Sequence, residues 1–184
     1  MKRALLLLLA CACSPTDVVV ASIEAGPDGP PFRTCVGNQD CSPNEFCERA
    51  RCDDVTGGCA PRPIMCDESS SPVCGCDGTT YWNDCVRKSN AATSATQGSC
   101  DTSALTCDDA TPCPSGAYCA RLYPQGQCDT NGSGACWVLP LNCPEADAGD
   151  GLIWMKCPAT PLDCASTCDA IRSQATYASA QSCP

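Results

Sequence analysis

The amino-acid sequence predicts a small disulfide-rich α+β protein built from two tandem cysteine-rich modules. Twenty-two of its 184 residues are cysteine, a proportion typical of scaffolds held together by disulfides. The chain has only two Phe, three Trp and four Tyr, so neither half can bury a large apolar core. Cross-links that restrict the unfolded chain compensate for a small core, and they persist in an oxidising compartment.

Twenty of the cysteines fall into two blocks of ten that share a spacing. In each block five residues separate the first cysteine from the second, five more separate the second from the third, and fourteen precede the last. Because fixed spacing is the sequence signature of repeats, we interpret the chain as a duplication: module 1 (35–100), a hinge (101–106) and module 2 (107–184). The cysteines are Cys35, Cys41, Cys47, Cys52, Cys59, Cys66, Cys74, Cys76, Cys85 and Cys100, then Cys107, Cys113, Cys119, Cys128, Cys136, Cys143, Cys157, Cys164, Cys168 and Cys183.

Residues 1–12 resemble an export signal of the bacterial lipoprotein type. Lys2 and Arg3 precede a short apolar run that cannot span a bilayer. A small residue then precedes a cysteine twice, and either Cys11 or Cys13 fits as the acylated residue. We therefore expect an exported protein with a lipid anchor, in the periplasm or on the cell surface. The alternative is a secreted protein with an ordinary cleaved signal.

The segment that follows, residues 13–34, is rich in Pro and Gly, and no cysteine occurs between Cys13 and Cys35. Such a composition is typical of a flexible linker, and we expect it to separate the modules from their anchor.

Several classes of function are excluded by what the sequence lacks. There is no histidine, so the common general base and the Ser–His and Cys–His nucleophile pairs are missing. Neither a Cys-x-x-Cys pair nor a glycine-rich phosphate loop occurs. The formal net charge of −10 disfavours binding to nucleic acid. We expect no enzyme activity, no cofactor, no metal site and no nucleic-acid partner.

One helix is expected in the first module, over residues 85–92. This segment is rich in Ala and free of Gly and Pro, and it follows two candidate N-caps, Asn83 and Asp84. A Thr/Ser/Ala stretch, predicted as a strand, leads from this helix to the last cysteine of the block. Upstream, Asp77-Gly78 predicts a tight hairpin turn.

A specific motif lies between Cys66 and Cys85. Seven residues separate Cys66 from Cys74, six more lead to Tyr81, and three more lead to Cys85. Within this frame stand PVCG at 72–75, DG at 77–78 and TYWNDC at 80–85. The motif resembles the Kazal domain, a family of secreted serine-protease inhibitors and follistatin-like modules. The resemblance covers about residues 59–100 and implies a short antiparallel sheet against one helix, closed by disulfides.

The resemblance also implies a site. In inhibitory members of the family, a loop after the second cysteine lies in the protease cleft as a rigid, substrate-like strand. By position this contact loop comprises Cys66, Asp67, Glu68 and Ser69, with Glu68 as the specificity residue and Glu68–Ser69 as the scissile bond. Asn83 matches the asparagine whose side chain hydrogen-bonds the loop backbone. Glu68 would suit a protease with a basic specificity pocket.

The cysteines depart from the family pattern in two places. The usual fifth cysteine, shortly beyond Cys85, is absent, and Cys76 is extra. The family topology implies the pairs Cys74–Cys100 and Cys66–Cys85, and we expect Cys59–Cys76 as the third pair, although ten cysteines permit many other pairings. An epidermal-growth-factor-like module fits the last cysteines less well, because it expects Gly or Pro and an aromatic residue soon after Cys76.

Two functions therefore remain open. One is inhibition of a serine protease through Glu68–Ser69. The other is a non-inhibitory extracellular role in binding, adhesion or spacing, with another extracellular protein as partner.

The second module lacks the motif and resembles a degenerate copy. A helix is expected over residues 168–175, with Thr167 or Asp169 at its start, followed again by a Thr/Ser/Ala strand. Trp137 and Trp154 are scarce large aromatics in a small module, so we expect them to belong to its core.

Overall fold

The structure is a computed structural model that describes residues 33–129, 132–144, 153–158 and 164–180. The predicted signal peptide, both candidate lipidation cysteines (Cys11 and Cys13) and almost all of the predicted linker lie outside these residues. Within the described ranges, no helix is long and apolar enough to cross a membrane. The described chain contains nine disulfides, two short α-helices and antiparallel sheets, which confirms the small disulfide-rich α+β class. So many disulfides indicate an exported or extracellular protein.

The chain first forms a small antiparallel sheet in the order β1–β3–β2. Its elements are β1 (Thr34–Cys35), the 3-10 helix η1 (Asn38–Asp40), β2 (Glu45–Glu48) and β3 (Gly57–Pro61). Two disulfides, Cys35–Cys47 and Cys41–Cys59, cross-link this sheet. Phe46 is fully buried in it, with 0% of its surface exposed. One aromatic ring and two disulfides thus hold a sheet that is too small to fold on apolar burial alone.

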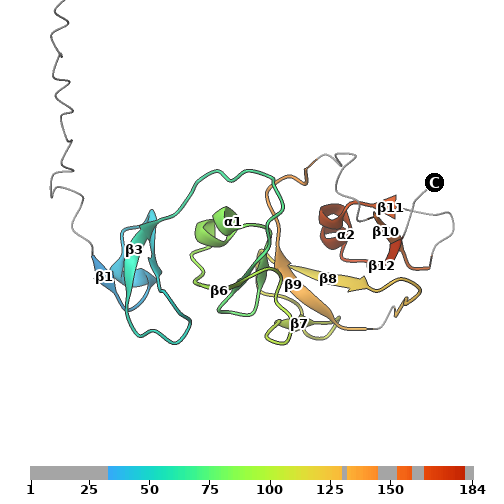
Figure 1. Cartoon of the computed structure of the whole chain (residues 1–184), viewed down its shortest axis with the longest axis horizontal. Coiled ribbons are helices and arrows are strands. Elements are labelled where there is room, and N and C mark those ends of the chain that lie inside the picture. Colours follow the sequence, from blue (N-terminus) through green and yellow to red (C-terminus); the bar gives the residue numbers. More distant parts are fainter. Residues whose placement is uncertain (1–32, 130–131, 145–152, 159–163, 181–184) are drawn as a thin grey trace, which may run out of the picture. The chain divides into compact units, whose positions relative to one another are not determined.

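The next segment forms a three-stranded antiparallel unit with one helix (Figure 1). Its elements are β4 (Val73–Gly75), β5 (Thr80–Tyr81), α1 (Asp84–Ser89) and β6 (Ser94–Gln97). The predicted hairpin turn joins β4 to β5, and Gly78 adopts the positive φ of 76° that the turn requires. Asp77 supports the turn by accepting hydrogen bonds from the Thr79 backbone N–H (3.0 Å) and the Tyr81 hydroxyl (2.7 Å). Burial and this carboxylate raise the pKa of Tyr81.

Helix α1 begins where the sequence predicts but ends earlier. Asn83 is the N-cap, because its side-chain oxygen accepts a hydrogen bond from the Val86 N–H at 2.8 Å. The helix ends at Ser89 rather than near residue 92, and Ala91 takes a positive φ of 57°. A non-glycine residue in this left-handed region marks a sharp end to the helix, so the predicted last turn does not form.

The second block begins with another three-stranded antiparallel arrangement, in the order β7–β9–β8. Its strands are β7 (Thr106–Cys107), β8 (Tyr118–Tyr123) and β9 (Gly134–Val138). The disulfides Cys107–Cys119 and Cys113–Cys136 cross-link it. Cys119 lies opposite Cys136 in the ladder, as Cys47 lies opposite Cys59 in the first sheet.

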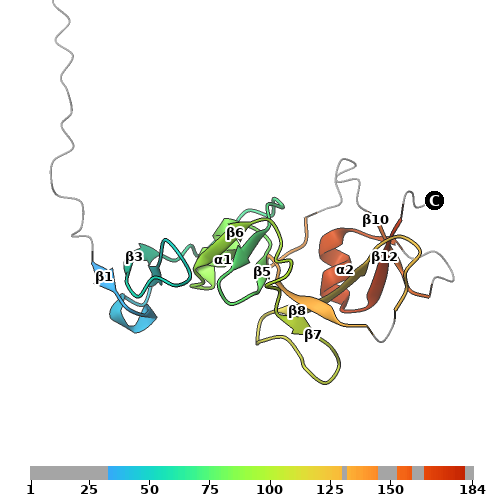
Figure 2. The same ribbon diagram turned by 60° about the horizontal axis from the view of Figure 1, so that its bottom comes forward.

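The chain ends, within the described residues, in a second unit of short strands and a helix. Its elements are β10 (Ile153–Lys156), β11 (Cys164–Ala165), α2 (Thr167–Ser173) and β12 (Thr176–Ala180). β10 pairs antiparallel with both β11 and β12, as β4 does with β5 and β6. Helix α2 lies against β8 and β10 (Figures 1 and 2). Ser166, not Thr167 or Asp169, caps it, because its hydroxyl accepts a hydrogen bond from the Asp169 N–H at 3.1 Å.

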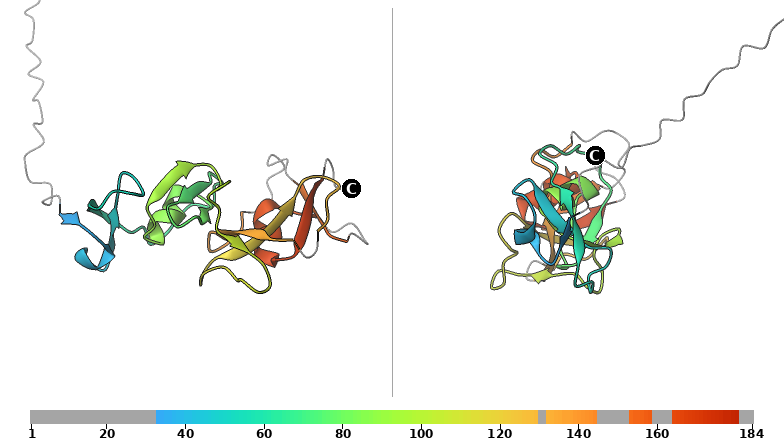
Figure 3. Two further views of the ribbon diagram at one scale, coloured as in Figure 1. Left: turned by 90° about the horizontal axis from the view of Figure 1, so that it is seen from below. Right: turned by 90° about the vertical axis from the view of Figure 1, so that its left-hand side faces the viewer.

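The two blocks join in one nine-stranded sheet. β5 pairs in parallel with β9, and β8 pairs in parallel with β12; the strands β8, β9 and β12 can be followed in yellow, orange and red in Figure 3. The predicted hinge 101–106 is bonded to both blocks. The Leu105 N–H donates to the Gly78 carbonyl at 2.8 Å, and the Leu105 carbonyl accepts from the Cys136 N–H at 2.9 Å.

Residues of both blocks also share one apolar core. Its buried members are Tyr81, Trp82, Val86, Ala120, Leu139, Cys168 and Ile171. Trp137 is half-buried and packs against this cluster, with its ring centroid 6.5 Å from that of Trp82. Trp154 is also half-buried and donates its indole N–H to the Thr167 hydroxyl at 2.9 Å. Trp137 therefore contacts the core, as expected, whereas Trp154 lies beside the start of helix α2 and does not belong to this cluster.

Candidate protease-contact loop

The predicted contact loop runs from Cys66 to the start of β4, and a disulfide fixes each end. Cys66 is bonded to Cys85 in helix α1, and Cys74 in β4 is bonded to Cys100. Both are pairs that the resemblance implies. Residues 67–71 between these anchors are exposed. The loop is thus a short exposed segment whose two ends are anchored to the rest of the protein by disulfides.

The third expected pair, Cys59–Cys76, is wrong. Cys59 pairs with Cys41, at a Cα–Cα distance of 5.5 Å, and Cys76 pairs with Cys52 at 5.3 Å. Cys59 lies in β3 of the first sheet, where Cys41 is within reach, whereas Cys76 follows β4 in the next unit. The disulfides of residues 59–100 therefore reach back to Cys41 and Cys52.

Asn83 hydrogen-bonds the loop backbone on both sides of Glu68. Its side-chain amide nitrogen donates to the Asp67 carbonyl and to the Ser69 carbonyl, both at 3.0 Å. Because its amide oxygen also caps helix α1, this residue joins the loop to the helix. Asn83 is only 5% exposed, so these bonds are shielded from water. The contacts are those that the resemblance implies for this asparagine.

Trp82 hydrogen-bonds the Glu68 carbonyl, which lies between the two carbonyls that Asn83 binds. Its indole N–H donates to the Glu68 carbonyl at 2.8 Å, and its own carbonyl accepts from the Ser71 N–H at 3.0 Å. Three consecutive loop carbonyls, at residues 67–69, thus accept hydrogen bonds from two adjacent side chains. This contact was not predicted from the sequence. Its only signal is that a buried tryptophan generally finds an acceptor for its N–H.

The Asp67 side chain stiffens the loop from the solvent side. Its carboxylate accepts hydrogen bonds from the hydroxyl and from the backbone N–H of Ser69. These two bonds, of which the hydroxyl contributes more, lower the pKa of Asp67 below its ordinary value. The loop is thus tied both to the protein interior and to itself.

An apolar pair precedes the acidic residues of the loop. Ile64 and Met65 are among the most exposed large apolar side chains in the described part of the protein, at 96% and 88%. Asp67 and Glu68 follow, and both are exposed. The exposed segment therefore offers apolar contact, negative charge and a fixed backbone.

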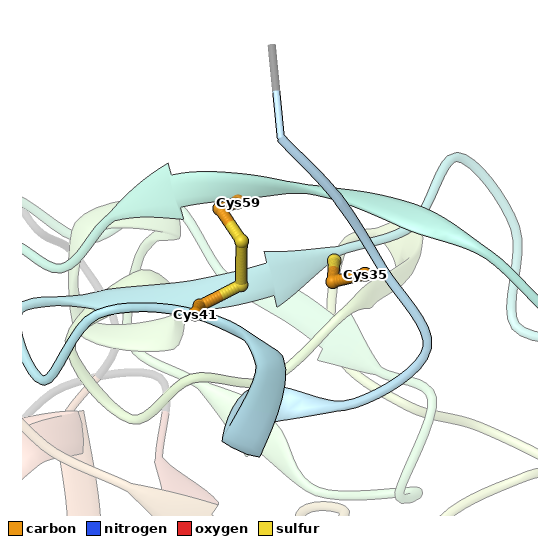
Figure 4. Close-up of side chains that lie close together, drawn as sticks. All are labelled: Cys35, Cys41 and Cys59. Atoms are coloured by element: carbon orange, nitrogen blue, oxygen red, sulfur yellow. A yellow bond between two sulfur atoms is a disulfide. The ribbon is translucent and has the colours of Figure 1, made fainter. Parts of the chain in front are cut away.

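The cysteine sulfurs form clusters that could be mistaken for metal sites. The Sγ atoms of Cys35, Cys41 and Cys59 lie within 4.8 Å of one another (Figure 4), as do those of Cys107, Cys113 and Cys119. Each of these cysteines is in a disulfide. Metal binding requires thiolates, so these clusters reflect neighbouring disulfides and not ligand sets.

Comparisons with protein-family models, with curated proteins and with solved structures found no match for this chain.

Proposed function

We propose that this protein is an exported Kazal-like inhibitor of a serine protease. Residues 66–71 would occupy the active-site cleft, with Glu68 in the specificity pocket and the Glu68–Ser69 bond next to the catalytic serine. The observation that carries this proposal is the pair of hydrogen bonds from Asn83 to the backbone on either side of Glu68, in a loop closed by disulfides at both ends.

The physical basis of inhibition is preorganisation. A peptide that is already fixed loses little conformational entropy on docking, so more of the contact energy appears as affinity. Cleavage of Glu68–Ser69 would not release fragments. The Glu68 side stays attached through Cys66–Cys85, and the Ser69 side stays attached through Cys74–Cys100 and Asn83. The two new ends remain close, which favours resynthesis of the bond over dissociation.

The identity of residue 68 indicates the class of target. An exposed glutamate at this position complements a basic specificity pocket, and it does not suit pockets that select Arg, Lys or large apolar side chains. The net charge of −10 further favours association with a cationic protease, since complementary charge accelerates encounter.

The proposal is tested by titrating purified protein against a glutamate-specific and a trypsin-like serine protease. Stoichiometric, tight inhibition of the first is expected, and Glu68→Lys is expected to transfer inhibition to the second. Asp53→Lys, the same change of charge at an exposed position outside the loop, is the matched control and should leave the target unchanged. Simple digestion of the wild type by both proteases, or inhibition that does not follow residue 68, would reject the proposal.

We further propose that the second block is a degenerate copy of the first. Its support is the shared cysteine plan: Cys66–Cys85 corresponds to Cys143–Cys168, and Cys52–Cys76 corresponds to Cys128–Cys157. Each helix has its cysteine directly after its first residue, and a strand follows each helix. The lipid anchor at Cys11 or Cys13 also belongs to the proposal, and mass spectrometry of the mature N-terminus tests it.

The second candidate function is non-inhibitory binding or spacing. One contact favours it: the Glu68 carbonyl already accepts a hydrogen bond from Trp82 and is not free.

A further inference from the structure

We propose that Trp82 is a positioning residue that restrains the Glu68 carbonyl and thereby slows docking of the loop into a protease. This inference rests on the proposed function and concerns how that same site is controlled. The observation is the 2.8 Å hydrogen bond from the indole N–H of Trp82 to the Glu68 carbonyl oxygen.

The bond matters because this oxygen belongs to the proposed scissile bond. When a serine protease receives a substrate-like strand, donors of its oxyanion hole must reach the carbonyl oxygen that is attacked. Those donors approach from the protease. Trp82 donates from the inhibitor's own interior, since only 2% of its surface is exposed. The oxygen must leave the indole, at least in part, before the oxyanion hole can bind it well.

The two neighbouring residues thus act in opposite directions. Asn83 holds the carbonyls of Asp67 and Ser69, which flank the scissile bond, so its hydrogen bonds can persist in the complex. Trp82 holds the one carbonyl between them, which the protease needs.

The indole cannot easily move aside to release the carbonyl. Its ring packs against Trp137 of β9, with centroids 6.5 Å apart and an interplanar angle of 60°. The Trp82 backbone is fixed as well, because its N–H donates to the Val138 carbonyl at 3.0 Å and its carbonyl accepts from the Ser71 N–H. Release of the carbonyl therefore requires the loop to move, not the tryptophan.

The size of the effect follows from the strength of one hydrogen bond. If the Trp82–Glu68 hydrogen bond stabilises the loop as much as an ordinary protein hydrogen bond does, the loop with this bond formed (restrained) is roughly two- to tenfold more populated than the loop with it broken (released). Since only the released loop docks fully, the apparent affinity for the protease is the intrinsic affinity multiplied by the fraction of protein in the released state. If release precedes docking, the association rate constant carries this factor, and the dissociation rate constant is little changed.

Trp82→Phe tests the proposal, because it removes the N–H and keeps an aromatic ring against Trp137. Association and dissociation with a glutamate-specific serine protease are measured by stopped-flow and surface binding. The association rate constant is expected to rise roughly two- to tenfold, with dissociation nearly unchanged. Trp154→Phe makes the same exchange at a tryptophan whose N–H donates to Thr167 and not to the loop, and it should change neither constant. An unchanged or slower association for Trp82→Phe, with the fold intact by circular dichroism, would overturn the proposal.

Two further measurements separate this inference from the proposed function. The indole proton of Trp82 should show a large NMR shift change when the protease binds, which a purely structural tryptophan would not show. If the wild type is digested and does not inhibit, the proposed function fails, and the inference is judged by the rate of cleavage at Glu68–Ser69. Faster cleavage of Trp82→Phe than of Trp154→Phe would support the restraint, and equal rates would overturn it.

Discussion

Replacing Asn83 by serine separates the two tasks that this side chain performs. In the wild type its oxygen caps α1 and its amide nitrogen bonds the carbonyls of Asp67 and Ser69. A serine hydroxyl can cap a helix, as Ser166 does for α2 in this same chain, but it is too short to reach the loop carbonyls. Asn83→Ala removes the cap and the loop bonds together. The pair of variants therefore isolates the loop bonds.

The expected magnitudes follow from these contacts. An N-cap contributes about 1 kcal/mol to stability, and each of the two loop hydrogen bonds contributes about 1 kcal/mol. The free energy of unfolding should fall by about 2 kcal/mol for Asn83→Ser and by about 3 kcal/mol for Asn83→Ala. If the loop bonds serve preorganisation, losing about 2 kcal/mol should raise the inhibition constant roughly 30-fold in both variants.

Stability is measured by guanidinium unfolding with the disulfides intact, followed by tryptophan fluorescence, and inhibition is measured against the glutamate-specific protease. An Asn83→Ser protein that inhibits as tightly as the wild type would refute the claim that these bonds hold the loop for docking. Equal stability of the serine and alanine variants would refute the capping argument.

Two other predictions concern a buried cation and an exposed carboxylate. Arg87 is 3% exposed and forms a salt bridge with Glu48 at 3.0 Å, so Arg87→Met should lower the free energy of unfolding by about 2 kcal/mol. Lys88 is exposed, so Lys88→Met should change it by less than about 1 kcal/mol. Equal losses for the two variants in guanidinium unfolding would contradict this prediction. Because hydrogen bonds from Ser69 lower the pKa of Asp67, the carboxylate supports the loop above its ordinary pKa, and this support is lost as pH falls through the lowered value. The Ser69 amide proton should therefore titrate by NMR with a midpoint below the usual aspartate pKa of about 3.9, and Asp67→Asn should abolish the transition; a midpoint at or above that value would show that the bonds do not form in solution.

The sequence predicted best what depends on neighbours along the chain. The Asp77-Gly78 turn needs only a glycine with positive φ between two short strands, and both blocks have a helix followed by a strand because the composition changes there. The cap of α2 is Ser166, which precedes both predicted positions, Thr167 and Asp169, although its signal is present in the sequence. Ser166 and Asp169 stand three apart, and the Ser166 hydroxyl also donates to the Asp169 carboxylate at 2.8 Å.

The sequence predicted less well what depends on distant segments. The expected pair Cys59–Cys76 assumes that the disulfides stay within residues 59–100, whereas the partners of these cysteines, Cys41 and Cys52, precede residue 59. The parallel contact of β5 with β9 was not predicted either. β5 has two residues, too few to show a hydrophobic period that would reveal a neighbour on each side.

The Trp82–Glu68 bond belongs to this non-local class, and it connects the second block to the site. The direction of the indole depends on Trp137 and Val138 in β9, which come more than fifty residues later in the chain. The second block lacks the motif of the contact loop, yet its strand fixes the residue that holds the proposed scissile carbonyl. Substitutions in β9 that tilt the Trp82 ring are therefore expected to alter docking at Glu68 without touching the loop. Changes in β6, on the other side of β4 from β5, should not, because β6 bonds neither β5 nor β9 in the described ladder. If β9 substitutions alter docking and β6 substitutions do not, the second block supports the site. If neither alters docking, the loop acts alone.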